Sequence, residues 1–265
     1  MKLTVVISYY KALDNLKLIL KALNNQSSRD FEVIVSEDDN NQETTSYLQN
    51  NKKLYCFPII HLHQEEDKGF RKNMMLNRSI VRSNSGFLAF IDGDCVPHKH
   101  FAKEYIKNIE DGYFLSGRSV MLGEKISSEV KKDLSLSRLN LLSLMFSDSW
   151  KIKEGVYFPF CRFLYKKRGL LGRNWGIKKE YLLKVNGFDE DYVNAGVGED
   201  VDIEWRLISI GLKLKLVKNR AIVYHLYHSK TYLEDRVRDN YTLLHKKKSL
   251  ENIICLNGIS NTVGE

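Results

Sequence analysis

The most informative stretch of this chain is Phe87-Leu88-Ala89-Phe90-Ile91-Asp92-Gly93-Asp94-Cys95-Val96-Pro97. An apolar run without polar alternation is typical of a strand that is buried on both faces in a parallel α/β sheet. Ligands of such sheets bind at the carboxyl ends of the strands, where Asp92 and Asp94 stand on either side of a glycine. The stretch therefore predicts an α/β fold with a binding site at this strand end.

Asp92 and Asp94 predict a bound cation, because two carboxylates this close repel each other when no cation lies beside them. A hard divalent ion, Mg²⁺ or Mn²⁺, that bridges the oxygens of a diphosphate meets this need. The alternative is an Asp-Gly turn whose carboxylates cap the next helix. His225 and His228, at positions i and i+3 near the end of an apolar run, could complete an octahedral site, although a single histidine at a strand end is more often structural.

The composition limits the class of protein. Its 265 residues can bury a substantial core, and 41 Lys and Arg against 33 Asp and Glu leave a net charge of +8, which favours a polyanionic partner. No apolar run is long enough to span a bilayer, and residues 1–8 are too short and strand-like for a signal peptide. The four cysteines, Cys56, Cys95, Cys161 and Cys255, show no CxxC spacing. This predicts free thiols in a reducing cytoplasm rather than a disulfide frame or a zinc site.

The first part of the chain predicts a β-α-β unit. Strands at 3–7 and 31–35 flank a helix whose leucines recur at helical spacing over 13–23, so the strands should be parallel with a right-handed crossover. The second strand ends in Glu37-Asp38-Asp39-Asn40, where Asp39 can accept hydrogen bonds from a uracil or a ribose. The alternative is that these residues only cap the helix that follows.

A cationic segment follows the strand predicted at 59–62. Lys68-Gly69-Phe70-Arg71-Lys72-Asn73 stands just ahead of a helix, where cations, backbone N–H groups and the helix dipole suit a diphosphate. Such a run is more often a solvated loop, and its place between two other candidate nucleotide contacts favours binding. A helix over 98–111 and a strand over 113–116 are expected next.

The middle of the chain, residues 122–171, has the weakest pattern. Its apolar residues between Leu134 and Phe146 predict a helix buried on a wide face, and Lys166-Lys167-Arg168-Gly169 predicts a mobile basic loop. No repeat and no Pro/Gly/Ser linker occurs, so no separable second domain is expected.

An acidic cluster follows a helix predicted at 178–185, which Gly187 ends in the left-handed conformation. Capping explains one or two acidic residues in a first helical turn, at about 0.3–1 kcal/mol each, but not the three behind glycines in Gly196-Val197-Gly198-Glu199-Asp200-Val201-Asp202. Mutual repulsion in a cleft can raise the pKa of one carboxyl toward a value that suits a general base, and Asp200 is the candidate. A basic amphipathic helix at 233–248 is expected to cover the core or to rest against anionic lipid.

In this order the motifs resemble those of a family 2 glycosyltransferase of the A-type fold with a C-terminal galactosyltransferase-like segment, over residues 1 to about 230. The nucleotide-sugar half of that family is matched by Val6-Ile7-Ser8-Tyr9-Tyr10, by Glu37-Asp38-Asp39-Asn40 and by Asp92-Gly93-Asp94, its metal-binding D-x-D. Its G-x-x-x-x-R-N-x-G-I block is similar to the segment from Lys68 to Ile80, although Ser79 and Leu76 replace the Gly and the Arg. The resemblance implies a Rossmann-like, mostly parallel central sheet flanked by helices.

Two later segments, Asn186-Gly187-Phe188 and residues 198–202, resemble those of β-1,4-galactosyltransferases and bacterial chondroitin-type polymerases. In that family the Asp after the Glu deprotonates the acceptor hydroxyl, a role that falls on Asp200. The tryptophan of the family's acceptor platform is missing, with Ala195 and Val197 in its vicinity, so a different acceptor is compatible with the pattern.

The resemblance implies a full set of site residues. Donor binding is assigned to Ser8, Tyr10, Asp39, Arg71, Asn77, Asp92 and Gly93. Catalysis is assigned to Asp200 and Glu199, acceptor binding to Trp175 and Asp202, and metal binding to Asp94, His225 and His228.

The expected function is that of an inverting, metal-dependent glycosyltransferase. It would move a sugar from a nucleotide donor, UDP-linked, to a glycan or lipid-linked acceptor in bacterial surface polysaccharide synthesis, with Mn²⁺ or Mg²⁺ as cofactor. Residues 1–120 are expected to bind the donor, 121–230 to bind the acceptor and to hold the catalytic residues, and 231–265 to form a basic helical tail. We expect a cytoplasmic protein with peripheral contact to an anionic membrane and no nucleic-acid partner.

Two alternatives stay open. A sugar-nucleotide pyrophosphorylase should have a Gly-rich, basic loop after the first strand, and Ser8-Tyr9-Tyr10-Lys11-Ala12 is not one. A non-catalytic binder of RNA or anionic glycan fits the net charge of +8 but leaves three acidic clusters unexplained, because acids repel phosphates without a metal.

Overall fold

The computed structural model describes residues 1–160, 168–194, 199–229 and 234–262. Within them, a seven-stranded sheet has the order β3-β2-β1-β4-β8-β6-β9, and a small sheet has the order β5-β10-β7. Every pairing in the large sheet is parallel except those of β8 with β4 and β6. Its strands are β1 Leu3–Tyr9, β2 Phe31–Glu37, β3 Ile59–Leu62, β4 Phe87–Asp92, β6 Tyr113–Ser116, β8 Asn174–Lys178 and β9 Lys213–Leu216. The small sheet consists of β5 Cys95–Pro97, β7 Arg118–Met121 and β10 Ile222–His225.

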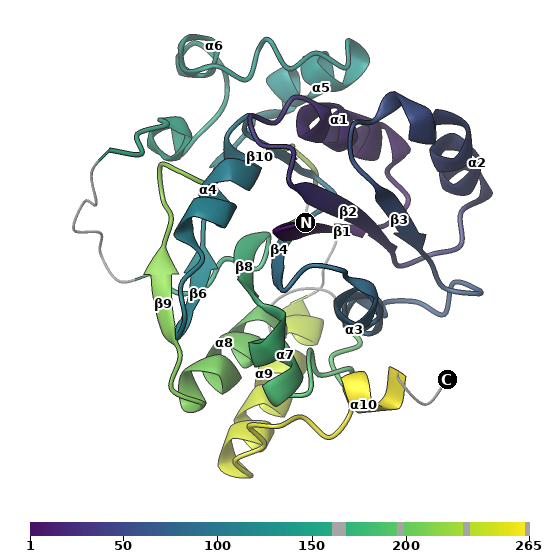
Figure 1. Ribbon diagram of the computed structural model, residues 1–265, viewed down its shortest axis with the longest axis vertical. Coiled ribbons are helices and arrows are strands. Elements are labelled where there is room, and N and C mark those ends of the chain that lie inside the picture. Colours follow the sequence, from purple (N-terminus) through teal and green to yellow (C-terminus); the bar gives the residue numbers. More distant parts are fainter. Residues whose placement is uncertain (161–167, 195–198, 230–233, 263–265) are drawn as a thin grey trace.

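Helices lie on both sides of the large sheet, as Figure 1 shows. The described helices are α1 Leu13–Asn24, α2 Gln42–Asn51, α3 Lys72–Arg82, α4 Phe101–Asn108, α5 Glu124–Lys132, α6 Leu141–Met145, α7 Lys179–Lys184, α8 Glu199–Ser209, α9 Glu234–Ser249 and α10 Ile259–Thr262. Two 3₁₀ turns are η1 Lys52–Leu54 and η2 Ile152–Gly155. The predicted fold class, a mostly parallel sheet between helices, is confirmed.

Each face of the large sheet has its own core. Side chains alternate along β1, so that Val5 and Ile7 enter one core and Val6 enters the other. The first core takes apolar side chains from α1, α4 and α5, and the second takes them from α3, α7 and α8. Because β1, β2 and β4 are parallel neighbours, their carboxyl ends meet at one edge of the sheet.

One sequence prediction for the middle of the chain fails, and one strand that follows it was not predicted. The helix predicted from Leu134 to Phe146 is wrong, because Leu134 has a positive φ of 44° that interrupts the helical backbone. The residues of α6 form only a short helix, and Phe146 directly after it is 85 % exposed. The pattern also gives no sign of β8, whose burial depends on pairing with β4 and β6. Lys166 and Lys167 of the predicted basic loop lie outside the described residues.

The tail helix predicted at 233–248 corresponds to α9, and residues 231–233 lie outside the described part. Leu244 is buried, and the Lys247 ammonium lies 2.6 Å from one carboxylate oxygen of Asp189 and 2.6 Å from one of Asp191. This face of α9 therefore packs on the loop after α7. Among the helices of the described residues, none has both the length and the apolarity that crossing a bilayer requires.

Candidate active site

The turn after β4 is held against the end of β1. Ser8 of β1 is the register partner of Asp92, and the Gly93 N–H donates a hydrogen bond of 2.6 Å to the Ser8 carbonyl oxygen. A Cβ at Gly93 would lie only 2.9 Å from that oxygen, so a larger residue would push the two strand ends apart. Gly93 thus fixes where Asp92 and Asp94 emerge.

Lys72, the first residue of α3, joins two acidic segments. Its Nζ lies 3.1 Å from Asp92 Oδ1 and 3.5 Å from Glu199 Oε1, and its side chain is 19 % exposed. Burial opposes the charged form of Lys72, but the carboxylates of Asp92 and Glu199 outweigh it and raise the pKa of the ammonium. Burial also raises the pKa of Glu199. Sequence reasoning missed Lys72 as a site residue, because the cationic run does not reveal which of its cations faces the carboxylates.

Arg71 precedes Lys72 and is anchored through its backbone. Its N–H lies 3.1 and 3.0 Å from the two carboxylate oxygens of Asp38, and its guanidinium donates to the Phe70 carbonyl oxygen. Burial raises the pKa of Asp38 to about 6, while the Arg71 N–H works in the opposite direction. Asp38, which the sequence did not single out from its acidic neighbours, therefore holds the loop that carries Arg71.

A pocket of about 350 Å³ lies beside this loop, and it is lined by Ser8, Tyr9, Tyr10, Asp38, Gly69, Phe70 and Lys72. The Tyr10 ring is 51 % exposed, and its hydroxyl donates to Asp67. Asp39, the residue predicted to contact the base or the ribose, is 5 % exposed, with its Oδ2 3.9 Å from Lys11 Nζ. The pocket thus joins Ser8 and Tyr10, both predicted donor contacts, to Asp38 rather than to Asp39.

Asp94, His225 and His228 converge as predicted for a metal site. Asp94 Oδ2 lies 3.5 Å from His225 Nε2 and 3.2 Å from His228 Nε2. Around a cation with bonds of about 2.1 Å, neighbouring ligand atoms lie about 3.0–3.4 Å apart. The distance from Asp94 to His228 is within this range and the distance to His225 is just above it, so this donor set could hold a divalent ion after a small shift of His225. Burial would raise the pKa of Asp94, but His228 and His225 lower it to about 2. Burial lowers the pKa of His225, which favours the neutral imidazole that binds metals.

The three acidic residues at the start of α8 have different surroundings. Glu199 faces Lys72, and Asp200 is half-buried with its carboxylate accepting the Val201 N–H at 2.9 Å. A Cβ at Gly172 would lie 2.9 Å from Asp200 Cβ, so this glycine leaves room for Asp200. The glycine loop 196–198, together with Ala195, lies outside the described residues.

Asp202 is not placed to bind an acceptor. Its side chain is 1 % exposed and accepts a hydrogen bond of 2.7 Å from Arg206 Nε and one of 3.3 Å from the Tyr192 hydroxyl. The acceptor role predicted for Asp202 is therefore wrong in this geometry. An Asp and an Arg four residues apart on a helix are a recognisable pair, and this spacing is the signal that could have found the structural role.

Two other predicted contacts are also sealed in the interior. Trp175 is 1 % exposed and stacks on Phe90 with ring centroids 4.8 Å apart, so it cannot contact an acceptor. Asn77 is fully buried, donates to the carbonyl oxygen of Phe188 and accepts the N–H of the same residue. Asn77 fixes the loop after α7 instead of touching a donor.

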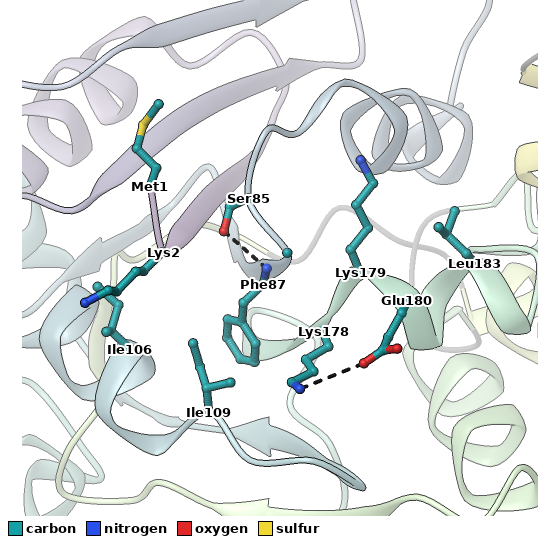
Figure 2. A pocket seen from close by; sticks show the side chains of 11 residues that line it. Met1, Lys2, Ser85, Phe87, Ile106, Ile109, Lys178, Lys179, Glu180 and Leu183 are labelled. Carbon is teal, nitrogen blue, oxygen red and sulfur yellow. Dashed lines mark hydrogen bonds and ion pairs between the residues drawn. The ribbon is translucent and has the colours of Figure 1, made fainter.

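A larger pocket of about 570 Å³ lies at the opposite end of the strands (Figure 2). Its lining is mostly apolar, from residues that precede or begin β1 and β4 and from α4 and α7, including Met1, Phe87, Ile106 and Leu183. Lys178 at its rim pairs with Asp111 and Glu180. No acidic cluster like those at the carboxyl edge lines this pocket among the described residues, so size alone does not identify the site.

Sequence comparisons identify two domain families in the chain. The model of glycosyl transferase family 2 matches residues 4–169, and a model described as the N-terminal domain of galactosyltransferase matches residues 155–229. A β-1,3-glucosyltransferase from Campylobacter jejuni named for GalNAc(5)-diNAcBac-PP-undecaprenol is 25 % identical over 153 residues, which cover 55 % of this chain and 49 % of that protein. Glycosyltransferase AglE from Haloferax volcanii is 25 % identical over 108 residues, 40 % of this chain and 34 % of that protein. The chain thus spans about half or less of these relatives.

Solved structures show the same fold. The mannosyltransferase PcManGT from Pyrobaculum calidifontis, in complex with GDP-Man and Mn²⁺, has a TM-score of 0.62 at 15 % identity and is matched over 94 % of this chain and 64 % of that chain. GalNAc-T7 with UDP, GalNAc and Mn²⁺ has a TM-score of 0.65 at 14 % identity, over 93 % of this chain and 48 % of that chain. S. aureus TarS 1-349 with UDP has a TM-score of 0.60 at 16 % identity, over 93 % of this chain and 65 % of that chain. Since the model of glycosyl transferase family 2 matches more than half of its length, the chain belongs to that family.

Proposed function

We propose that this glycosyltransferase moves a sugar from a UDP-linked donor to a hydroxyl of a glycan or lipid-linked acceptor, with inversion and with Mn²⁺ or Mg²⁺ as cofactor. The observation that carries the proposal is the meeting of three charged groups at one sheet edge: the Asp94–His225–His228 cluster, the Lys72 bridge and the half-buried Asp200. Membership in glycosyl transferase family 2 supports this proposal over the pyrophosphorylase and the non-catalytic polyanion binder.

The donor side is built from residues of the first 120 positions. Ser8 and Tyr10 line the 350 Å³ pocket, where the Tyr10 ring offers a face for a base. Lys72 is positioned beside the Asp92 carboxylate, so its ammonium can meet a diphosphate oxygen that approaches the same edge, and Arg71 is the second candidate cation. UDP is proposed because GalNAc-T7 and TarS were solved with UDP, although PcManGT was solved with GDP-Man.

Asp94, His225 and His228 would hold the divalent ion. When bound there, such an ion acts as a Lewis acid that offsets the negative charge of a leaving diphosphate. The positive charge of Lys72 acts in the same sense from the side of Asp92 and Glu199.

Asp200 is the proposed general base. Its carboxylate would take the proton of the acceptor hydroxyl as that oxygen bonds to the anomeric carbon and the bond to the diphosphate breaks. Attack from the face opposite the leaving group inverts the anomeric configuration in one displacement. Glu199 would position Lys72 rather than take the proton, because its carboxylate already faces that ammonium. Acceptor binding is proposed for the half of the chain from residue 121 to 230.

The setting is also a proposal. A lipid-linked glycan as acceptor, in surface polysaccharide synthesis, follows the name of the C. jejuni relative. The described cysteines, Cys56, Cys95 and Cys255, are free thiols, which favours a reducing compartment such as the cytoplasm. Contact of the basic tail with an anionic membrane would use the exposed side of α9, since Leu244 and Lys247 face the protein.

The test is Asp200→Asn, which keeps the size of the side chain and removes the base. Transfer should fall by roughly 10²–10⁴, while calorimetry with UDP and Mn²⁺ gives a wild-type affinity. The matched control is Asp14→Asn, because Asp14 is also acidic in a first helical turn, is 71 % exposed and lies on α1. Loss of UDP binding together with transfer would make Asp200 a donor-side or structural residue, and unchanged transfer would remove the proposed base.

A further inference from the structure

The thiol of Cys95 lies beside the Asp94–His225–His228 cluster. Cys95 in β5 and His225 in β10 are directly opposite each other in an antiparallel pairing, so their side chains leave the same face of the small sheet. Cys95 Sγ lies 3.3 Å from Asp94 Oδ1, and the ligand atoms of Asp94, Cys95 and His225 all lie within 4.8 Å of one another. His228 Nε2 lies outside this group of three but is 3.2 Å from Asp94 Oδ2, which makes His228 the candidate for a fourth ligand.

We propose that Asp94, Cys95, His225 and His228 form a closed four-coordinate site for a thiophilic divalent ion such as Zn²⁺. This inference rests on the proposed function only because both use Asp94, His225 and His228 as metal ligands. Around a tetrahedral zinc ion, a sulfur and an oxygen ligand lie about 3.5 Å apart, and a nitrogen and an oxygen about 3.3 Å. The sulfur is 3.3 Å from Asp94 Oδ1, and the two imidazole nitrogens are 3.5 and 3.2 Å from Asp94 Oδ2. The carboxylate must therefore turn so that one of its oxygens faces all three of these ligands.

The two kinds of ion would use the cluster differently. Mg²⁺ and Mn²⁺ prefer oxygen and imidazole ligands, leave the thiol protonated and keep coordination positions for a diphosphate. Zn²⁺ recruits the Cys95 thiolate, whose proton passes to solvent, and four protein ligands then fill its coordination sphere. Zinc bound in this way excludes the donor diphosphate and inhibits transfer.

The exposure of the ligands agrees with this arrangement. His228 is half-exposed and Asp94 is 24 % exposed, whereas Cys95 is fully buried. An ion therefore enters from the His228 side and meets the thiol at the inner wall of the site. The spacing of cysteines in the sequence gives no hint of this, because only one of the four ligands is a cysteine and the histidines come from a distant segment.

The experiment uses the full chain, stripped of metal with a chelator. Co²⁺ replaces zinc as a spectroscopic probe, and the wild type should give the intense visible bands of four-coordinate cobalt together with a thiolate-to-cobalt charge-transfer band. Cys95→Ser should lose that band and bind Zn²⁺ at least about 100-fold more weakly in a chelator competition, since even changes outside the ligand shell cost 10–100-fold. Its affinity for Mn²⁺, measured by calorimetry, should stay at the wild-type value. Cys56→Ser, which removes an exposed thiol elsewhere, is the control.

Each outcome separates this inference from the proposed function. A wild-type cobalt spectrum without the charge-transfer band, or a zinc affinity that Cys95→Ser leaves unchanged, overturns the inference even if Mn²⁺ binds. Zinc binding that depends on Cys95, without any binding of Mn²⁺, supports the inference and removes the metal from the proposed function. Because Cys95 is fully buried, circular dichroism verifies the fold of the variant, and the wild-type spectrum tests the sulfur–metal bond without any substitution.

Discussion

Asp202→Asn tests whether neighbouring acidic residues of α8 have separate roles. Asp202 and Arg206 are each 1 % exposed, and their closest N–O distance is 2.7 Å. The guanidinium also donates to the carbonyl oxygens of Val185 and Gly187, at 2.9 and 2.8 Å. An asparagine keeps the shape of the side chain but leaves the buried guanidinium without its counter-charge.

The expected loss follows from that burial. Removing one partner of a buried ion pair costs about 3–5 kcal/mol, and the lower part of this range, about 3–4 kcal/mol, applies because Arg206 keeps its two carbonyl acceptors. For a chain of this size one kcal/mol lowers the melting midpoint by about 2–4 °C, so the midpoint should fall by roughly 6–16 °C. The acceptor KM of the folded enzyme should not change.

Thermal and urea unfolding measure the loss, and transfer kinetics well below the midpoint measure the KM. The double variant Asp202→Asn/Arg206→Met should recover most of the stability, because replacing both charges by neutral groups removes the unpaired guanidinium. Asp235→Asn, which breaks an exposed pair with Arg238 on α9, should leave the midpoint unchanged. Wild-type stability of Asp202→Asn with a raised acceptor KM would refute the structural role and restore the acceptor contact.

Three further predictions concern the donor edge. Lys72→Met should weaken donor binding and lower the free energy of unfolding by about 3 kcal/mol near neutral pH. The loss should be smaller at acidic pH, because burial raises the pKa of Glu199 and the carboxylate left without its partner is then protonated. Equal losses in denaturant titrations at neutral and acidic pH would argue against the bridge. Burial raises the pKa of Asp38 to about 6. Protonated Asp38 therefore stabilises the folded protein by about 3 kcal/mol below about pH 4, and this contribution is lost as the pH rises through 6. Asp38→Asn should flatten this part of the stability profile, and a profile parallel to that of the wild type would contradict the shift. Asp94→Ala should abolish transfer and the Mn²⁺-dependent part of UDP binding in calorimetry while keeping the melting midpoint, and undiminished transfer would sink the metal assignment.

The fold was predictable where burial is continuous along the sequence. The apolar run of β4 predicted a central parallel strand, because both faces of that strand are buried. The helical spacing of leucines predicted α1, because one face of that helix packs on the core. β8 could not be found in this way, since Asn174 and Gly176 dilute its pattern and its place depends on strands far away in sequence. The leucines near α6 led to the wrong prediction of a buried helix, because several of these apolar side chains are exposed.

The site was predictable in its residue types and less so in their roles. Asp94, His225 and His228 lie close together, as their strand-end positions predicted, and their role as metal ligands stays a prediction. Trp175 and Asn77 did not, because a matching motif does not tell whether a side chain faces the cleft or the core. Which of two adjacent residues, such as Arg71 and Lys72, faces a carboxylate depends on where the helix begins, and sequence patterns place helix ends least well.

Because of the small sheet, the cluster of Asp94, His225 and His228 can assemble only late in the formation of the protein. Asp94 lies next to β5, and His225 closes β10 after about half of the chain has intervened, so a growing polypeptide carries the carboxylate long before its partners are synthesised. The β1–β4 unit can pair from local crossovers, whereas β5 must wait for β10. An ion that binds only the completed cluster then acts as a reversible clip between early and late segments, and at one hundred times its Kd it adds about 2.7 kcal/mol to the stability of the finished protein. Under the proposed function, binding of a cation would mark a chain that has been made and folded through β10.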